Sequence, residues 1–263
     1  MKHHRRQSAF VLALLAAGLV CAGCSKGPPK HGTKLTVAPT NSVPAAESQQ
    51  ALDRSAEALR KRFRDLDVRR AVVEHAADGR LIVTLPELPR ERFASCRRAI
   101  ENRGLLEFRM IHPESEKMIA LRIPEPGFEI LELPYGTPYG PSTRKYLVDK
   151  KPERGLTGKH IRRAWVARDH LKVKPEIGIE FNPEGAALFA QVTTDYSPRN
   201  GKYSYLGIVL NGRLLSAPKI NMPITGGNAV IEGNYTVQEA SELVAALENP
   251  LDVPLHIVDE RSF

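Results

Sequence analysis

The sequence predicts an α+β protein in which a ferredoxin-like base subdomain is followed by a mixed α+β head subdomain, with antiparallel sheets that carry helices on one face. In the first half of the chain, patterns typical of helix, strand, strand, helix and strand follow one another, which is most of a split β-α-β unit. In the second half, Asn211-Gly212 separates two strand patterns and predicts a tight antiparallel hairpin. The 263 residues, 42% of them hydrophobic, are enough to bury a sizeable core.

Composition divides the chain into five parts. A basic start followed by an apolar run predicts a signal peptide, and a stretch with four prolines and two glycines predicts a flexible linker. Seven further prolines interrupt the middle of the chain and separate the two subdomains. The expected boundaries are signal peptide 1–23, linker 24–46, ferredoxin-like base 47–112, Pro-rich connection with short strands 113–154, and head 155–263.

The first residues predict export and lipid anchoring. Residues 9–20 form an apolar run of twelve, which is too short for a bilayer-spanning helix but fits the core of a secretory signal. Ala22-Gly23-Cys24 resembles the bacterial lipobox, in which the cysteine receives the lipid. Arg5-Arg6 also occurs in twin-arginine signals, although an ordinary basic start fits the flanking residues better. We therefore expect a protein anchored to the membrane through Cys24 in the bacterial envelope and facing the periplasm, with inner and outer membrane both open.

The residue types that carry chemistry are scattered. Once the signal is removed and Cys24 is lipidated, only Cys96 remains, and its helical context predicts a small buried apolar side chain. The histidines do not show a metal-ligand spacing, and the sequence contains no nucleophile elbow, phosphate loop or dinucleotide fingerprint. We accordingly expect no catalytic residue, no metal and no cofactor, and a protein that is not an enzyme.

The base begins with a helix whose apolar residues recur at helical spacing. Asp78-Gly79 predicts a hairpin turn, and Gly104 predicts the stop of the second helix. The expected elements are a helix over 47–66, strands over 70–75 and 80–85, a helix over 88–103 and a strand over 105–111.

The head shows two clear helix starts. Asn182-Pro183 supplies an N-cap and a first-turn proline, and Thr236 with Glu239 forms a capping box. The expected strands are 161–168, 176–181, 205–210, 213–217, 228–231 and a closing strand over 253–258. In the Pro-rich connection, short strands are expected over 128–133 and 145–148, and residues 134–141 are expected to be a loop, either a mobile binding loop or a plain surface connection.

The series of turns, caps and hairpins resembles the SecD family of protein-export membrane proteins. The resemblance to the head of the first periplasmic domain rests on Leu156–Lys159, Ile179–Ala186, Gly207–Asn221, Pro223–Asn228 and Gly233–Ala240. Residues 57–111 are similar to the base of the same domain, through Ile82–Pro86 and Leu105–Arg109. The resemblance implies a periplasmic domain of base plus head, here expected to occur as a stand-alone lipoprotein.

The resemblance also implies a function. SecD couples a proton gradient to export through its membrane part, and the sequence contains no ionisable residue inside a membrane-spanning segment. We therefore expect a non-catalytic protein that binds exported polypeptide, or a partner from the Sec translocon or the envelope, in protein export. One alternative is a structural scaffold module of an unrelated envelope complex. Another is a ligand-binding protein that uses the loop 134–141.

The segment 217–224 is the expected contact for polypeptide. Two prolines within a strand-like run indicate a sheet edge or an exposed loop, and edges accept added strands. The candidate binding residues are Pro218, Ile220, Met222, Pro223 and Ile224. The alternative, in which Ile220 and Ile224 belong to the core and the prolines shape a turn, remains open.

The charge distribution decides between two classes of partner. A net charge of +8 first suggests nucleic acid. The signal peptide holds three of the basic residues, however, and residues 155–263 hold 11 basic and 12 acidic residues. Residues 51–112 hold 14 basic and 10 acidic residues, so the excess lies in the base, close to the expected anchor. This pattern favours an anionic membrane surface over nucleic acid.

Overall fold

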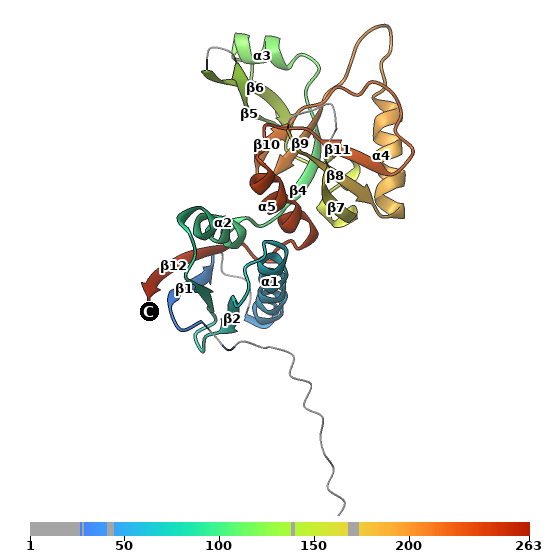
Figure 1. Ribbon diagram of the computed structural model, residues 1–263. Coiled ribbons are helices and arrows are strands. Elements are labelled where there is room, and N and C mark those ends of the chain that lie inside the picture. Colours follow the sequence, from blue (N-terminus) through green and yellow to red (C-terminus); the bar gives the residue numbers. More distant parts are fainter. Residues whose placement is uncertain (1–26, 28, 41–44, 138–139, 168–173) are drawn as a thin grey trace, which may run out of the picture.

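The computed structural model describes residues 27, 29–40, 45–137, 140–167 and 174–263 (Figure 1). The expected signal peptide and Cys24 lie outside these residues. Among the helices that the structure describes, none combines the length and the apolar character needed to cross a bilayer. The head lies above the base in Figure 1, and α5 of the head contacts α1 and α2 of the base.

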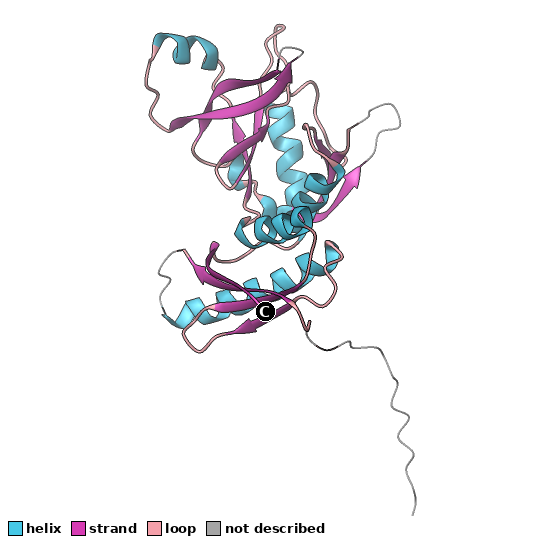
Figure 2. Ribbon diagram, turned by 60° about the vertical axis from the view of Figure 1, so that its left-hand side comes forward, coloured by secondary structure: helices cyan, strands magenta, loops and turns pink. Residues whose placement is uncertain are grey.

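The base is a complete ferredoxin-like unit with the element order β-α-β-β-α-β. Its sheet has the strand order β12-β1-β3-β2, and every neighbouring pair is antiparallel. Figure 2 shows α1 lying along one face of this sheet. The elements are β1 Gly32–Pro39, α1 Ala45–Asp65, β2 Val72–His75, β3 Leu81–Pro86, α2 Arg90–Glu101 and β12 Leu255–Ser262.

Three expected assignments in the base are wrong, although the fold class is confirmed. Residues 32–39, expected within the flexible linker 24–46, form β1, in which Leu35 and Val37 are buried. The C-terminal strand, expected to close the head, is β12 and pairs with β1. The strand expected over 105–111 is β4 (Leu106–Met110), and it pairs with β9 of the head. The head is therefore inserted between α2 and the last strand of the base.

The core of the base lies between the sheet and its two helices. Leu52, Leu59 and Phe63 of α1 pack with Cys96 and Ile100 of α2. The prediction for Cys96 is confirmed, since its side chain is completely buried and burial raises the pKa of its thiol to about 12. A thiol in this state is a packing residue and a poor nucleophile.

The head contains two three-stranded antiparallel sheets and one hairpin arm. The sheets have the orders β10-β9-β4 and β11-β8-β7, and Phe108, Phe181 and Phe189 form one ring cluster in the core that the sheets share. The remaining elements are α3 Ser115–Leu121, β5 Phe128–Thr137, β6 Gly140–Asp149, β7 Ile161–Ala167, β8 Glu176–Phe181, α4 Pro183–Asp195, β9 Leu206–Leu210, β10 Arg213–Ser216, β11 Asn228–Ile231 and α5 Val237–Glu248.

The local signals for turns and caps in the head are confirmed. Asn211 and Gly212 both have positive φ, at 50° and 78°, as the tight turn between β9 and β10 requires. Asn182 caps α4 by accepting a hydrogen bond from the Gly185 amide, and Thr236 and Glu239 form the capping box of α5.

The hairpin of β5 and β6 extends further than expected. Residues 134–137 and 140–141, expected to be loop, continue the two strands, and pairing runs from Phe128 with Asp149 to Thr137 with Gly140. Proline lacks a backbone N–H and is tolerated only where a strand has an unpaired edge. Pairing persists at Pro134 and Pro141 because both lie in a two-stranded sheet, where every strand has such an edge. The expected loop is therefore mostly the far end of a two-stranded arm, and its residues 138–139 lie outside the described part of the chain.

Candidate polypeptide-binding site

The expected contact segment 217–224 continues the pairing of the β9–β10 hairpin. The Leu206 amide donates to the Pro218 carbonyl oxygen at 3.0 Å, and the Ile220 amide donates to the Ser204 carbonyl oxygen at 2.9 Å. The Ile220 side chain is 5% exposed and belongs to the head core. Ile220 therefore follows the alternative in which it is a core residue, because the pairing turns its side chain inward.

The other four candidate residues lie at the surface. Pro218 and Pro223 are exposed, and the side chains of Met222 and Ile224 are 66% and 38% exposed. The Ile224 amide donates to the Thr193 hydroxyl oxygen at 2.9 Å, which holds the end of the segment against α4. The structure thus places Met222 to Ile224 beside α4 and leaves Pro218 at the hairpin.

Lys219 connects this segment to a set of aromatic side chains. Its ammonium lies over the rings of Tyr203 and Tyr205, 5.1 Å and 5.9 Å from their centroids. Tyr205 pairs with Lys219 across the hairpin extension and lines a neighbouring hollow. The segment 217–219 therefore borders that hollow.

The hollow, which we name the aromatic groove, has a volume of about 560 Å³. That volume lies within the range typical of ligand-binding clefts. Its walls come from α3, from the β5–β6 arm, and from the stretch that links β4 to α3. The groove is lined by Ile111, His112, Pro113, Ser115, Glu116, Ile119, Ala120, Tyr135, Thr143, Arg144, Lys145, Tyr146 and Tyr205.

Three tyrosines and two cations set the character of the groove. The Arg144 guanidinium lies over the Tyr135 ring, 5.5 Å from its centroid, and a hydrogen bond with Tyr146 raises the pKa of Arg144. Lys145 forms an ion pair with Glu132 at 3.4 Å. Aromatic rings offer apolar contact area, and the cations beside them offer hydrogen-bond donors.

The wall of the groove is fixed by contacts to buried backbone. Ser115 accepts a hydrogen bond from the Leu147 amide at 2.7 Å, which attaches α3 to β6. The His112 ring packs edge-on against Phe128 at 5.1 Å between centroids. Sequence reasoning named Tyr135 only as part of the possible binding loop 134–141. It missed the groove as a whole, because Tyr135, Tyr146 and Tyr205 come from β5, from β6 and from the residue before β9, and only the fold brings them together.

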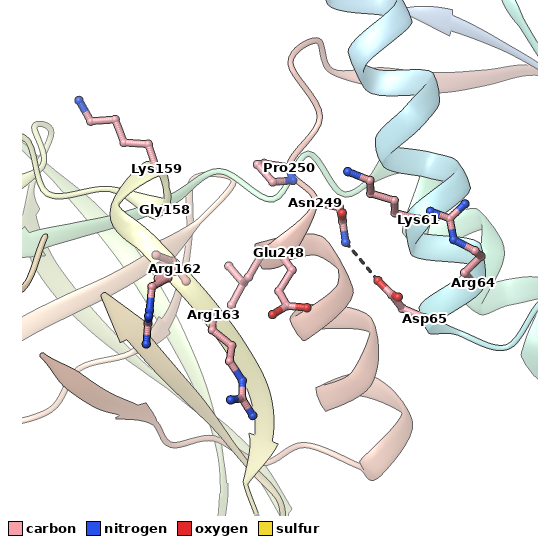
Figure 3. A pocket seen from close by; sticks show the side chains of 12 residues that line it. Lys61, Arg64, Asp65, Gly158, Lys159, Arg162, Arg163, Glu248, Asn249 and Pro250 are labelled. Carbon is pink, nitrogen blue, oxygen red and sulfur yellow. Dashed lines mark hydrogen bonds between the residues drawn. The ribbon is translucent and has the colours of Figure 1, made fainter. Parts of the chain in front are cut away.

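A second hollow, of about 450 Å³, lies at the junction of base and head (Figure 3). Figure 3 shows Glu248 of α5 next to Arg163 of β7, with Lys61 and Asp65 of α1 on the opposite side. The Asn249 side chain donates to the Asp65 carboxylate at 3.1 Å. Burial raises the pKa of Asp65, and the nearby Glu248 carboxylate adds to this shift.

Both arginines that β7 contributes to the junction hollow already have partners. Arg162 is paired with Glu180, and the Arg163 guanidinium lies 5.3 Å from the centroid of the Trp165 ring. We therefore regard the junction hollow as part of the contact between head and base.

Across the described part of the chain, no three His, Cys, Asp or Glu side chains are grouped so that they could hold a metal ion. His160 is only 2% exposed, and its Nδ1 accepts a hydrogen bond from the Thr157 amide at 3.1 Å. This histidine caps a short helical turn and has a structural role.

Comparison with known proteins places this geometry in a family context. Residues 132–252 match the family model described as SecDF, P1 head subdomain. The chain is 30% identical over 219 residues to the protein translocase subunit SecDF of Thermus thermophilus, which covers 80% of this chain and 28% of the relative. It is 32% identical over 223 residues to SecD of Desulfurispirillum indicum, covering 81% of this chain and 40% of the relative. The chain thus spans well under half the length of these relatives.

The solved structures agree with the sequence comparison. A structure described as a membrane component SecDF that enhances protein export superposes with a TM-score of 0.64 at 26% identity, covering 88% of this chain and all of that one. A crystal structure of SecDF in a super-membrane-facing form gives a TM-score of 0.65 at 26% identity, covering 88% of this chain and 30% of that one. These matches support a periplasmic domain of the SecD type in this chain, whose residues 132–252 correspond to the P1 head subdomain of SecDF.

Proposed function

We propose that this chain acts in protein export as a lipid-anchored periplasmic module that binds exported polypeptide in the aromatic groove and does not catalyse a reaction. The observation that carries the proposal is the position of the groove, whose wall residues from Tyr135 to Tyr205 lie within the residues that match the P1 head subdomain. The relatives are named as translocase subunits, and exported chains are the polypeptides that a periplasmic part of such a machine meets.

The chemistry of the groove suits an extended chain of no fixed sequence. Tyrosine rings contribute apolar area with little loss of conformational entropy, and their hydroxyl groups bond to backbone carbonyl groups. Arg144 and Lys145 add donors for the carbonyl oxygens of the bound chain. Because none of these contacts selects one side chain, we expect weak binding to many unfolded sequences.

Binding to an unfolded reporter polypeptide tests the proposal. Fluorescence anisotropy of a labelled, permanently unfolded chain gives the Kd for the wild type and for Tyr135→Ala. Tyr135 is 40% exposed, so its loss leaves the fold intact while it removes about 1 kcal/mol of aromatic contact, or about fivefold in Kd. Phe263→Ala is the matched control, since Phe263 is 47% exposed and lies on the base. Equal Kd values for all three proteins would exclude the groove as the binding site.

The anchor is tested separately at Cys24. Metabolic labelling with a radioactive fatty acid in a bacterial host should label the wild type and leave Cys24→Ala unlabelled. Labelling of both proteins, or of neither, contradicts lipid attachment at this residue. The result is independent of polypeptide binding, so the two parts of the proposal stand or fall separately.

A further inference from the structure

One end of the base gathers cationic side chains around the point where the chain enters the fold. The parallel strands β1 and β2 both pair antiparallel with β3, so they start at the same end of the sheet. The stretch that leads into β1 and the loop 66–71 that leads into β2 therefore lie together. We call Lys30, Arg69, Arg70 and Arg92 at this end the basic collar.

Hydrogen bonds connect the parts of the collar. Arg70 donates from Nε to the Gly27 carbonyl oxygen at 3.3 Å, which joins the loop to the entering chain. From the first turn of α2, Arg92 donates to the carbonyl oxygens of Leu66 and Asp67 at 2.9 Å and 2.8 Å. The collar is thus a continuous feature built from three segments of the base.

The collar presents positive charge to its surroundings. Lys30, Arg69 and Arg70 are exposed, and the Arg69 side chain is 87% exposed. Asp67 is the acidic side chain in the loop, and it forms an ion pair with Arg69 at 2.9 Å. The stretch from β3 into α2 adds Arg90 and the acidic side chains of Glu87 and Glu91, so five cations and three carboxylates at this end leave a net charge of +2.

We propose that the basic collar binds the headgroups of anionic phospholipids and so orients the domain on the membrane surface. The inference deepens the proposed function, because it rests on the anchor at Cys24 to bring this end of the base to the bilayer. Gly27 follows Cys24 by three positions, a reach of at most about 10 Å. That reach is similar to the Debye length of about 8–10 Å at physiological salt, so the collar would lie within the field of the charged lipids.

In protein export, this contact would hold the domain in a fixed orientation relative to the membrane. The head is inserted between α2 and β12, so both of its connections leave the base at the C-terminal end of α2. The collar lies at the N-terminal end of α2. With the collar on the lipid, the opposite end of the base, which carries the head, is directed away from the bilayer.

Vesicle flotation tests the proposal on the full chain carrying Cys24→Ala, which removes the lipid. Binding is measured to vesicles of phosphatidylcholine alone and of phosphatidylcholine with a minority of phosphatidylglycerol. The ratio of the two partition coefficients isolates the electrostatic contribution, because insertion of the apolar signal segment contributes to both. Lys30→Gln with Arg69→Gln tests the collar, and Arg70 and Arg92 are kept because they bond to backbone.

Arg80→Gln with Lys202→Gln is the matched control. Arg80 is paired with Asp78 in the β2–β3 turn at the other end of the sheet, as Arg69 is paired with Asp67, and Lys202 is an exposed lysine of the head. We expect the collar variant to lower the ratio by about fivefold for each charge removed and the control to leave it nearly unchanged. Equal losses in both variants, or no loss in the collar variant, would overturn the proposal. Neither result bears on fatty-acid labelling of Cys24 or on polypeptide binding.

Discussion

The guanidinium of Arg62 donates from Nε to the carbonyl oxygen of Asn249 at 2.8 Å, and so ties α1 of the base to the end of α5 of the head. The same side chain donates to the carbonyl oxygen of Ala99 at 2.7 Å and of Ala246 at 3.3 Å, and also to those of Asn102 and Arg103. It is completely buried, and burial lowers its pKa to about 9, so it remains a cation at neutral pH.

Replacing Arg62 should therefore weaken the junction of base and head. Arg62→Met keeps most of the volume but leaves five carbonyl groups without this donor, including the orphan carbonyls at the ends of α2 and α5. We expect a loss of about 3 kcal/mol or more in the free energy of unfolding, measured by urea denaturation. Arg64→Met is the matched control, because that side chain is 65% exposed, and its effect should stay within about 0.5 kcal/mol. A similar small effect for Arg62→Met would show that water replaces the guanidinium.

A second connection across the junction depends on pH. Arg98 of α2 binds both carboxylate oxygens of Glu242 on α5, at 2.7 Å and 2.9 Å. Burial alone would raise the pKa of Glu242, but the hydrogen bonds from Arg98 and Ser95 outweigh it and hold the pKa below its usual value. The carboxylate thus stabilises the fold above the usual carboxyl pKa of about 4.5, and this contribution is lost as the pH falls through the lowered value.

Glu242→Gln isolates this contribution. At neutral pH we expect the variant to be about 1–2 kcal/mol less stable than the wild type, since one charge-assisted contact is lost. The difference should shrink as the pH is lowered below about 4.5, because the wild-type carboxyl then becomes neutral as well. Urea midpoints across the acid range measure it. A difference that stays constant with pH would mean that the charge of Glu242 does not contribute.

The sequence predicts features that depend on neighbouring residues, but it does not predict pairings between distant segments. The hairpin at Asn211-Gly212 and the cap of α4 at Asn182 depend on residues close together in the chain, and both were predicted. The pairing of β1 with β12 joins residues more than 200 positions apart, and nothing local in Gly32–Pro39 indicates its partner. Prolines near both ends of this segment are typical of linkers, so a central strand of the base sheet was assigned to a linker.

In the candidate site, too, local features were predicted and tertiary contacts were not. The segment 217–224 was singled out from its prolines, and its exposed residues Met222 and Ile224 lie at the surface as expected. The burial of Ile220 follows from its pairing with Ser204, which is a tertiary contact. The aromatic groove beside the segment combines the β5–β6 arm with α3 and with Tyr205. The sequence pointed only to the loop 134–141 as a possible binding loop, because the other walls reach the groove through tertiary contacts.

Gly178 of β8 is required by the ring of Trp165 on β7. A Cβ atom at Gly178 would lie 2.3 Å from Cε2 of Trp165, so Gly178→Ala must displace the indole. We expect a loss of about 1–3 kcal/mol in the free energy of unfolding and a shift of tryptophan emission to longer wavelength. The chain contains a single tryptophan, so the emission reports on this site alone. Gly136→Ala is the control, because a Cβ there meets nothing within 4 Å, and both readouts should stay unchanged.

Tyr235 provides a test in which a deletion should not destabilise the fold. Its hydroxyl group is buried and has no hydrogen-bond partner among the described residues, and burial raises its pKa to about 12. Tyr235→Phe removes a hydroxyl whose desolvation is not compensated, so we expect the free energy of unfolding to stay the same or to rise by about 1 kcal/mol. Tyr196→Phe is the contrasting variant, because that hydroxyl is hydrogen-bonded to Glu153, and its loss should cost about 0.5–1.5 kcal/mol. If thermal or urea unfolding shows equal losses for the two variants, the Tyr235 hydroxyl has a partner in solution, and a bound water is then the simplest source.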